Sequence, residues 1–270
     1  MDNKNTKHPE HSKDPSLNSS AQTAAPVAVV TGAGSGIGAA TAERFAKEGW
    51  DVVLIGRRPD ALEATRKKIG ARGISLPLDL AERDSLNTVN RWAQMSSHIA
   101  SRIHAIVHNA GIYEPSTTLT STDVSWHRTF ELNVFSIIRL TQALFPYLKN
   151  NQGSLVTVSS TLGLKPTAGT AAYSASKAAL INWSQSFALE AAPLGVRVNC
   201  VCPGIVDTPI HEFHTASDKT ETLQKLGPLQ PLGRIGRPEE IAHMIWTLAG
   251  PGSEWTTGAT ISIDGGIGLT

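Results

Sequence analysis

Short apolar runs alternate with helical patterns along nearly the whole chain, and this alternation limits the folds that the chain can adopt. Strands of a parallel sheet are buried on both faces, so each of them reads as an almost continuous apolar run. The sequence predicts seven such strands, at Val27–Thr31, Val52–Ile55, Ile74–Leu78, Ile103–Val107, Leu155–Val158, Val196–Val201 and Ala259–Ile263. Strands that alternate with helices predict a three-layer, doubly wound α/β domain with a mostly parallel sheet.

The segments between these runs have the spacing of helices. We expect helices over Ile37–Glu48, from Pro59 onward, over Ser125–Lys149, around Tyr173 and over Pro238–Leu248. No internal repeat or interior linker interrupts the pattern, so residues 26–270 are predicted to form a single domain.

The first 25 residues differ from the rest of the chain. Charges of both signs alternate there without an apolar run, which fits neither a signal peptide nor a transit peptide. We therefore expect residues 1–25 to be a disordered N-terminal extension. No stretch reaches the ~18 apolar residues of a membrane-spanning helix. The net charge of +1 gives no support for a nucleic-acid or membrane surface.

The chain has two cysteines, Cys200 and Cys202, one residue apart on a predicted strand. This spacing is too constrained for a comfortable disulfide, so we expect two reduced thiols in the core. Reduced thiols suit a cytoplasmic protein.

Tyr173 and Lys177 lie four residues apart, so on a helix they share one face. A phenol has a reference pKa of about 10, and a nearby ammonium lowers that pKa by favouring the phenolate. The pair could therefore donate or accept a proton. Ser160, at the end of the fifth predicted strand, could offer a hydroxyl to the same reacting oxygen. Alone the pair is a weak signal, because a half-buried Tyr beside a solvated Lys is common in helices.

The first predicted strand runs directly into a glycine-rich turn, Thr31-Gly-Ala-Gly-Ser-Gly-Ile-Gly38, and then into a helix. Glycines allow positive φ and close approach of a pyrophosphate, which the helix N-terminus stabilises. The common fingerprint Gly-x-Gly-x-x-Gly is not met, because Ile37 takes the place of its third glycine. A phosphate-binding loop of the Gly-Lys-Ser/Thr type is excluded, because the turn has no lysine.

Further motifs follow this turn in order: Asn109-Ala110-Gly111, Ser160, Tyr173 with Lys177, and Pro203-Gly204. The ordered set resembles the short-chain dehydrogenase/reductase family over about residues 26 to 268. The resemblance implies a Rossmann fold and hydride transfer between a nicotinamide cofactor and a carbonyl or secondary alcohol. The chain departs from the family at His108, where an Asn usually precedes Asn-Ala-Gly. We interpret His108 as a structural residue.

The resemblance also implies a role for each catalytic residue. Tyr173 would be the general acid in carbonyl reduction and the general base in alcohol oxidation. Lys177 would lower the pKa of that tyrosine and bind the nicotinamide ribose, and Ser160 would hold the substrate oxygen. Asn133 would support a water that links Lys177 to solvent, although it could also be an ordinary polar residue of a helix interior.

Cofactor-binding residues are implied at the carboxyl ends of several strands. They are Gly32, Ser35, Gly36, Ile37 and Gly38 at the phosphates, Asp79 and Leu80 at the adenine, Asn109, Ala110 and Gly111 at the adenosine ribose, Tyr173 and Lys177 at the nicotinamide ribose, and Pro203, Gly204, Val206 and Thr208 at the carboxamide.

The second predicted strand ends in Gly56-Arg57-Arg58, with no carboxylate. In dinucleotide-binding folds an acidic residue there binds the ribose 2′-hydroxyl, whereas a guanidinium suits a 2′-phosphate. We therefore predict NADP(H), with NAD(H) as the possible alternative. Asp51 is at the wrong end of the strand, and Asp60 is expected to cap the next helix. Alternatively, the two arginines are solvated loop charges.

The sequence thus predicts an NADP(H)-dependent ketone reductase, with a 3-oxoacyl-thioester reductase as a narrower version. One alternative is an NAD-dependent alcohol or sugar dehydrogenase of the same family. A remote alternative is a non-catalytic NADP(H)-binding sensor, which would be expected to lose the Tyr or the Lys. Substrate determinants are expected in Tyr113–Leu119, Leu162–Thr170 and Pro209–Pro231.

No metal site is predicted, because His211, Glu212 and His214 lack the spacing of His-Glu-x-x-His. The late segments Pro231–Arg234 and Asp264–Gly266 resemble a region that packs between subunits in the family, which implies a homotetramer or a homodimer.

Overall fold

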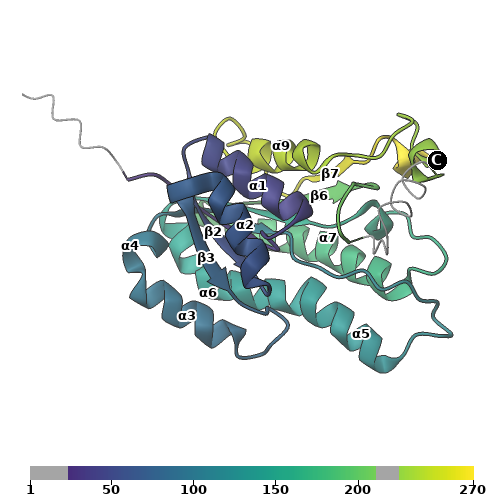
Figure 1. Ribbon diagram of the computed structural model, residues 1–270, viewed down its shortest axis with the longest axis horizontal. Helices are drawn as coiled ribbons and strands as arrows, with labels where there is room; N and C mark the ends of the chain where they lie inside the picture. The colour runs from purple at the N-terminus through teal and green to yellow at the C-terminus, as the bar shows by residue number, and fades with distance from the viewer. Residues whose placement is uncertain (1–23, 211–224) are drawn as a thin grey trace, which may run out of the picture.

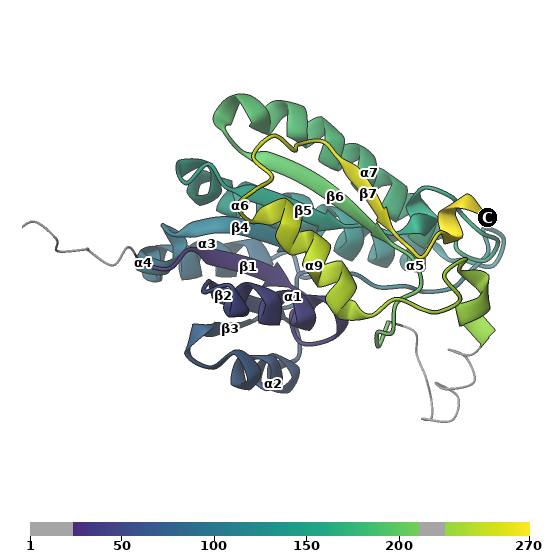
Figure 2. The ribbon, with the colours of Figure 1, turned by 90° about the horizontal axis from the view of Figure 1, so that it is seen from above.

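A computed structural model describes residues 24–210 and 225–270. Its seven strands form one sheet in the order β3-β2-β1-β4-β5-β6-β7, and every neighbouring pair is parallel (Figure 2). The strands are β1 (Val27–Thr31), β2 (Asp51–Gly56), β3 (Gly73–Pro77), β4 (Ile103–His108), β5 (Ser154–Val158), β6 (Arg197–Pro203) and β7 (Thr260–Ile263). The predicted doubly wound Rossmann fold is confirmed, with a sheet that is parallel throughout.

Helices cover both faces of this sheet (Figure 1). One face carries α1 (Gly36–Lys47), α2 (Pro59–Ile69) and α9 (Pro238–Ala249). The other carries α3 (Ser85–Met95), α4 (Ser97–Ala100), α6 (Ser136–Asn150) and α7 (Ala171–Ala191), and α5 (Asp123–Phe130) packs beside α7. Short 3₁₀ turns lie at Gly70–Arg72, Thr161–Gly163, Ala192–Leu194, Gly227–Leu229 and Ile267–Leu269.

Two apolar cores hold the three layers together, one on each face of the sheet. Neighbouring residues of a strand point to opposite faces, so Val29 packs into the core under α6 while Val30 packs into the core under α1. In the second core, the ring of Phe45 meets Trp50 and Trp246 edge-on, at centroid distances of 5.2 and 5.1 Å. Both cores follow from the continuous apolar runs of the strands.

The order of the strands reverses between β1 and β4. The chain leaves β1 towards β2 on one side, whereas β4 is followed by β5 on the other side. The loops after β1 and β4 therefore diverge, and ligands of doubly wound sheets bind in the resulting crevice at the carboxyl ends of the strands.

The predicted helix over Ser125–Lys149 is present, but it is not one regular α-helix. A π turn, Glu131–Phe135, separates α5 from α6. Such a turn inserts an extra residue and is frequent at functional sites. Asn133 lies in the middle of it.

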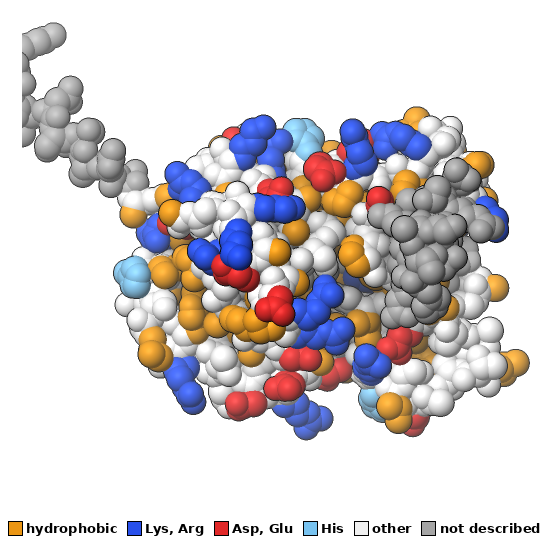
Figure 3. Space-filling view, viewed as in Figure 1, with side chains coloured by type: hydrophobic (Ala, Val, Ile, Leu, Met, Phe, Trp, Pro, Cys, Tyr) orange, Lys and Arg blue, Asp and Glu red, His pale blue; other side chains and the backbone are white. Residues whose placement is uncertain are grey.

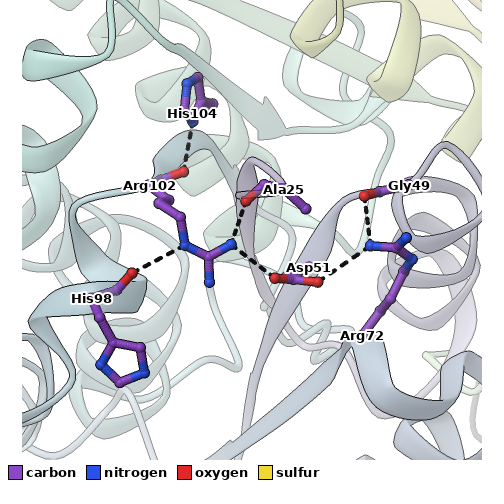
Figure 4. Close-up of polar contacts among 7 residues, drawn as sticks. All are labelled: Ala25, Gly49, Asp51, Arg72, His98, Arg102 and His104. Carbon is purple, nitrogen blue, oxygen red and sulfur yellow. Dashed lines mark hydrogen bonds and ion pairs between the residues drawn. The ribbon is translucent and has the colours of Figure 1, made fainter. Parts of the chain in front are cut away.

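The amino-terminal edge of the sheet is fixed by a cluster around Asp51 (Figure 4). The Asp51 carboxylate accepts from Nη1 of Arg72 at 3.3 Å and from Nη1 of Arg102 at 2.9 Å. Arg102 also donates to the carbonyl oxygens of Ala25 and His98. Asp51 is therefore at the end of β2 away from the crevice, as the sequence predicts.

Some expectations fall wholly or partly outside the described residues. Residues 1–23 of the expected extension lie outside the described ranges. So do residues 211–224 of the stretch Pro209–Pro231, which include His211, Glu212 and His214. Within the described ranges, no helix is long and apolar enough to cross a membrane. Lys and Arg are interspersed with Asp and Glu on the face seen in Figure 3. The expected reduced thiols are confirmed, since Cys200 and Cys202 are free and fully buried.

His108, the departure from the family pattern, is buried at the end of β4. Its Nε2 lies 2.8 Å from the hydroxyl of Thr141, and its Nδ1 has no partner in the described structure. Burial lowers the pKa of His108 from 6.5 to about 3, so the ring is neutral at physiological pH. These contacts agree with a structural role.

We predict that His108→Asn makes the fold less sensitive to acid. The unfolded chain binds a proton at His108 below about pH 6.5 and the folded chain does not, so stability is lost as the pH falls through this window. Between pH 7 and pH 5 the variant should lose about 2 kcal/mol less unfolding free energy than the unsubstituted protein. Urea unfolding at the two pH values measures this difference. An equal loss in both proteins would contradict the assignment.

Candidate active site

The glycine-rich turn after β1 packs against its neighbours so closely that side chains cannot be added to it. A Cβ on Gly38 would lie 2.3 Å from the carbonyl oxygen of Gly32, and a Cβ on Gly32 would lie 2.7 Å from Nδ2 of Asn109. Gly32 and Gly36 also have positive φ angles of 65° and 52°. The N-terminus of α1 thus opens onto the crevice beside bare backbone, an arrangement that suits an anionic ligand.

Thr31, the last residue of β1, ties this turn to the loop after β4. Its hydroxyl oxygen accepts from the main-chain N–H groups of Asn109 at 3.0 Å and Ala110 at 2.9 Å. In return, Nδ2 of Asn109 donates to the Thr31 carbonyl at 2.9 Å. Thr31 therefore fixes the two sides of the crevice to each other. Sequence analysis placed it in the motif but gave it no role.

Arg58 lies beside the glycine-rich turn. Its Nη2 is 3.4 Å from the hydroxyl oxygen of Ser35, and Arg57 and Arg58 are both exposed. On the neighbouring strand, Asp79 follows β3 and accepts from the main-chain N–H of Ala81 at 3.0 Å. The described structure thus places the adenosine-side candidates along the carboxyl ends of β1, β2 and β3.

Tyr173 and Lys177 lie on α7, as the spacing predicts, and the amino group of Lys177 is buried. Its Nζ donates to the carbonyl oxygen of Val158 at 2.9 Å. The same Nζ lies 5.6 Å from the centroid of the Tyr173 ring. A Cβ on Gly111 would come within 3.4 Å of it. Burial lowers the pKa of Lys177 from 10.5 to about 8.

The pKa of Tyr173 differs from the sequence-based expectation. Burial raises it to about 12, and the hydrogen bond with Ser160 lowers it only in part. The expected lowering was wrong for the protein without ligands, because burial of the phenol outweighs the contact that lowers its pKa. Tyr173 is therefore a protonated phenol at neutral pH.

Ser160 caps the 3₁₀ turn that follows β5. Its Oγ accepts from the main-chain N–H of Leu162 at 3.1 Å, and the side chain is buried. The neighbouring Ser159 donates to the Lys177 carbonyl at 2.8 Å and so fixes α7 against this turn. Ser160 and Tyr173 are brought together, which leaves two hydroxyl groups at one place in the crevice.

Asn133 is fully buried within the π turn. Its Oδ1 accepts from the N–H of Ile112 at 2.9 Å, while Nδ2 donates to the Ile112 carbonyl at 3.1 Å and to the hydroxyl of Ser176 at 3.0 Å. The side chain thus fixes the loop after β4 against α7. A water supported by Asn133 stays a prediction.

A second contact of the π turn was missed by sequence analysis. Arg139 of α6 pairs with Glu131 and donates to the carbonyl oxygen of Leu80 at 3.4 Å. It connects the π turn with the loop after β3, which carries Asp79 and Leu80. No pattern in the sequence signals the contact with Leu80, because the two residues are 59 positions apart in the chain.

The residues after β6 form the other wall of the crevice. Thr161 donates to the Pro203 carbonyl at 3.3 Å, Gly204 donates to Ile263, and Val206 pairs with Gly236. Thr208 lies against the glycine-rich turn, because a Cβ on Gly36 would be 3.1 Å from its side chain. In the described ranges, no group of three or more His, Cys, Asp or Glu residues could hold a metal ion.

Together, these groups define a class of protein. A glycine turn at the switch point of a Rossmann sheet can hold a dinucleotide, and a phenol, a hydroxyl and an amine beside it can move a proton to or from oxygen. This is the arrangement of a nicotinamide-dependent oxidoreductase.

Known proteins support this class. The family model described as "Enoyl-(Acyl carrier protein) reductase" matches residues 32–268. The 3-oxoacyl-[acyl-carrier-protein] reductase FabG of Thermotoga maritima is 35% identical over 245 residues, which cover 89% of this chain and 97% of that protein. The chain belongs to the short-chain dehydrogenase/reductase family.

Two further relatives show the range of the family. The cis-4-hydroxycyclohexanecarboxylate dehydrogenase of Sinomonas cyclohexanicum is 35% identical, over 89% of this chain and 95% of that protein. An NADPH-bound short-chain oxidoreductase of Pseudomonas aeruginosa, described as having an atypical catalytic centre, aligns with a TM-score of 0.83 and 33% identity, over 90% of this chain and 96% of that chain. The protein is thus an NAD(P)-dependent oxidoreductase that acts on a carbonyl or an alcohol.

We predict that Lys177→Met flattens the pH dependence of stability in mild alkali. The folded pKa of Lys177 is about 8 against 10.5 ordinarily, so the unfolded chain binds more protons between these values and the unfolding free energy rises with pH. From pH 8 to pH 10 this rise should be about 2 kcal/mol smaller in the variant. Urea unfolding at both pH values measures it, and Tyr173, present in both proteins, cancels. Parallel curves would contradict a buried, weakly basic amine.

Proposed function

We propose that the protein reduces a ketone with NADPH, and that a 3-oxoacyl thioester is the first substrate class to test. The choice of cofactor rests on the position of Arg58. This residue follows the end of β2 and lies 3.4 Å from Ser35, and the sequence has no carboxylate at that strand end. A guanidinium there suits a 2′-phosphate. The name of the Thermotoga relative supports the substrate class.

The residues of the crevice fit the cofactor. The turn at Gly32, Gly36 and Gly38, where added Cβ atoms would collide or strain the backbone, matches the close approach of a pyrophosphate. The remaining contacts would come from Ser35, Ile37, Arg57, Arg58, Asp79, Leu80, Asn109, Ala110, Gly111, Pro203, Gly204, Val206 and Thr208. When bound, the nicotinamide supplies the hydride.

The protein's own part is to place the carbonyl and to move a proton. The hydroxyl of Ser160 holds the substrate oxygen, where negative charge develops. The Tyr173 phenol donates its proton to the same oxygen. Lys177 stabilises the phenolate that remains, and a water supported by Asn133 returns the proton from solvent.

The protonation state of Tyr173 is compatible with carbonyl reduction. A pKa raised to about 12 keeps the phenol protonated at neutral pH, which is the form that donates a proton to a carbonyl. Alcohol oxidation needs the phenolate and therefore benefits from higher pH. The second candidate is an NAD-dependent alcohol or sugar dehydrogenase, and the Sinomonas relative, named as a dehydrogenase of a hydroxylated ring acid, supports the oxidation of an alcohol.

We further propose a homotetramer located in the cytoplasm. Leu229, Leu232 and Leu269 are 55, 71 and 93% exposed in the single chain, and they lie in or near the late segments that resemble the family's subunit contacts. Two reduced thiols, Cys200 and Cys202, agree with a reducing compartment.

Replacing Tyr173 by Phe should remove the proton donor and leave the cofactor contacts in place. We expect ketone reduction to fall by about 10²- to 10⁴-fold. NADPH binding, followed by its fluorescence, should stay within about twofold, because the ring and its packing are kept. Turnover close to that of the unsubstituted protein would refute Tyr173 as the acid.

Arg58→Asp should reverse the cofactor preference. Placing a carboxylate beside a 2′-phosphate removes a charge-assisted contact, so the KM for NADPH should rise roughly tenfold or more while that for NADH stays level or falls. Arg57→Asp tests the neighbouring arginine in the same way. Arg91→Asp, at an exposed position of α3, is the matched control and should change neither KM. An unchanged preference in both test variants would exclude these arginines as the determinant.

A further inference from the structure

Tyr113 is the aromatic neighbour of the catalytic phenol. Its ring meets the ring of Tyr173 edge-on, with the centroids 4.9 Å apart and the planes at 76°. Tyr113 is only partly buried, whereas Tyr173 is buried. One side of the Tyr113 ring therefore packs against Tyr173, while part of the residue stays accessible to solvent.

The residue before Tyr113 is fixed to the catalytic machinery. Both main-chain groups of Ile112 are held by the side chain of Asn133, at 2.9 and 3.1 Å. Asn133 also bonds to Ser176 of α7, next to Lys177 in the chain. The loop that carries Tyr113 thus starts from a point with a defined position relative to α7.

The residues after Tyr113 are fixed as well. The N–H of Ser116 donates to the Gly169 carbonyl at 2.9 Å, and the N–H of Ala171 donates to the Ser116 carbonyl at 3.4 Å. Ala171 is the first residue of α7. In addition, Glu114 forms an ion pair with Arg128 of α5 at 3.0 Å. Tyr113 therefore lies between two fixed points, Ile112 and Ser116, which are connected to the helix of Tyr173 through Asn133 and at Ala171.

We propose that Tyr113 is a positioning residue that supports the Tyr173 ring from the substrate side and limits the size of one substituent on the carbonyl carbon. A carbonyl oxygen held by Ser160 and Tyr173 places one of its substituents alongside the Tyr113 ring. An anchored aromatic ring cannot move away from a bulky group, so the site prefers ketones with a small substituent on that side. The size limit rests on the proposed ketone reduction. The positioning of the Tyr173 ring by Tyr113 does not depend on that proposal.

Kinetics with two ketones test the size limit. Ethyl acetoacetate carries a methyl group on the reacting carbonyl, and ethyl benzoylacetate carries a phenyl group. In Tyr113→Ala, the ratio of kcat/KM for the benzoyl ketone to that for the acetyl ketone should rise tenfold or more, on the order of what a change in pocket size yields. In the same variant kcat for ethyl acetoacetate should fall, with the KM for NADPH unchanged.

Tyr113→Phe is the matched control, because it keeps the ring and removes only the hydroxyl. It should retain both the ratio and kcat of the unsubstituted protein. Equal ratios in all three proteins would overturn the size limit. So would a rise in the Phe variant as large as that in the Ala variant, because a loss of the hydroxyl alone would then account for the effect.

Tyrosine NMR tests the positioning without turnover. The chain contains three tyrosines, Tyr113, Tyr147 and Tyr173, so protein with ¹³C-labelled tyrosine rings gives a small set of signals. Tyr173→Phe assigns one of them. In Tyr113→Leu the Tyr173 signal should shift because it loses the neighbouring ring, while Tyr147 of α6 stays in place and reports that the fold is intact.

A Tyr173 signal that stays in place in Tyr113→Leu would overturn the positioning role. If the unsubstituted protein reduces neither ketone, the proposed function fails for this substrate class and the size limit falls with it. The NMR result still tests whether the two rings are in contact, which the support of Tyr173 requires.

Discussion

The buried amino group of Lys177 is the constraint around which the candidate site is built. An amine taken out of water is costly unless it is hydrogen-bonded, and here the Val158 carbonyl supplies the acceptor at 2.9 Å. The surrounding chain must come close enough to bury it. Gly111 and Gly163 lack the side chains that would collide with Lys177 or crowd it. Three segments pack around this lysine: β5, the loop after β4 and the 3₁₀ turn. Their packing brings Ser160 close to Tyr173.

Much of the fold could be predicted because strands buried on both faces leave a direct trace in the sequence. All seven apolar runs match strands of the sheet. The ends were less predictable: β2 begins at Asp51 and β6 begins at Arg197, because hydrogen bonding of the backbone does not stop where apolar side chains stop. The π turn at Asn133 leaves no such trace, since its helical spacing differs from that of an α-helix by only one residue.

The candidate site, like the fold, could be predicted from the sequence only in part. Groups carried by one segment, such as the glycine turn and the pair Tyr173 and Lys177, could be predicted from spacing. Contacts between segments, such as those of Thr31 and Arg139, could not. The pKa of Tyr173 shows why: four-residue spacing indicates that Lys177 is near, but burial of the phenol decides the sign of the pKa shift.

The two ends of the described fold lie near opposite ends of the strands. This determines where a tether or a fusion partner can be attached. The chain enters β1 beside Ala25, where Arg102 anchors it at the edge away from the crevice (Figure 4). Thr270, by contrast, accepts from Lys165, two residues beyond the turn that Ser160 caps. A surface tether or a fused domain joined directly to the described fold before Ala25 therefore leaves the crevice open to solutes. The same attachment after Thr270 places its bulk against the loop that carries the reacting hydroxyl.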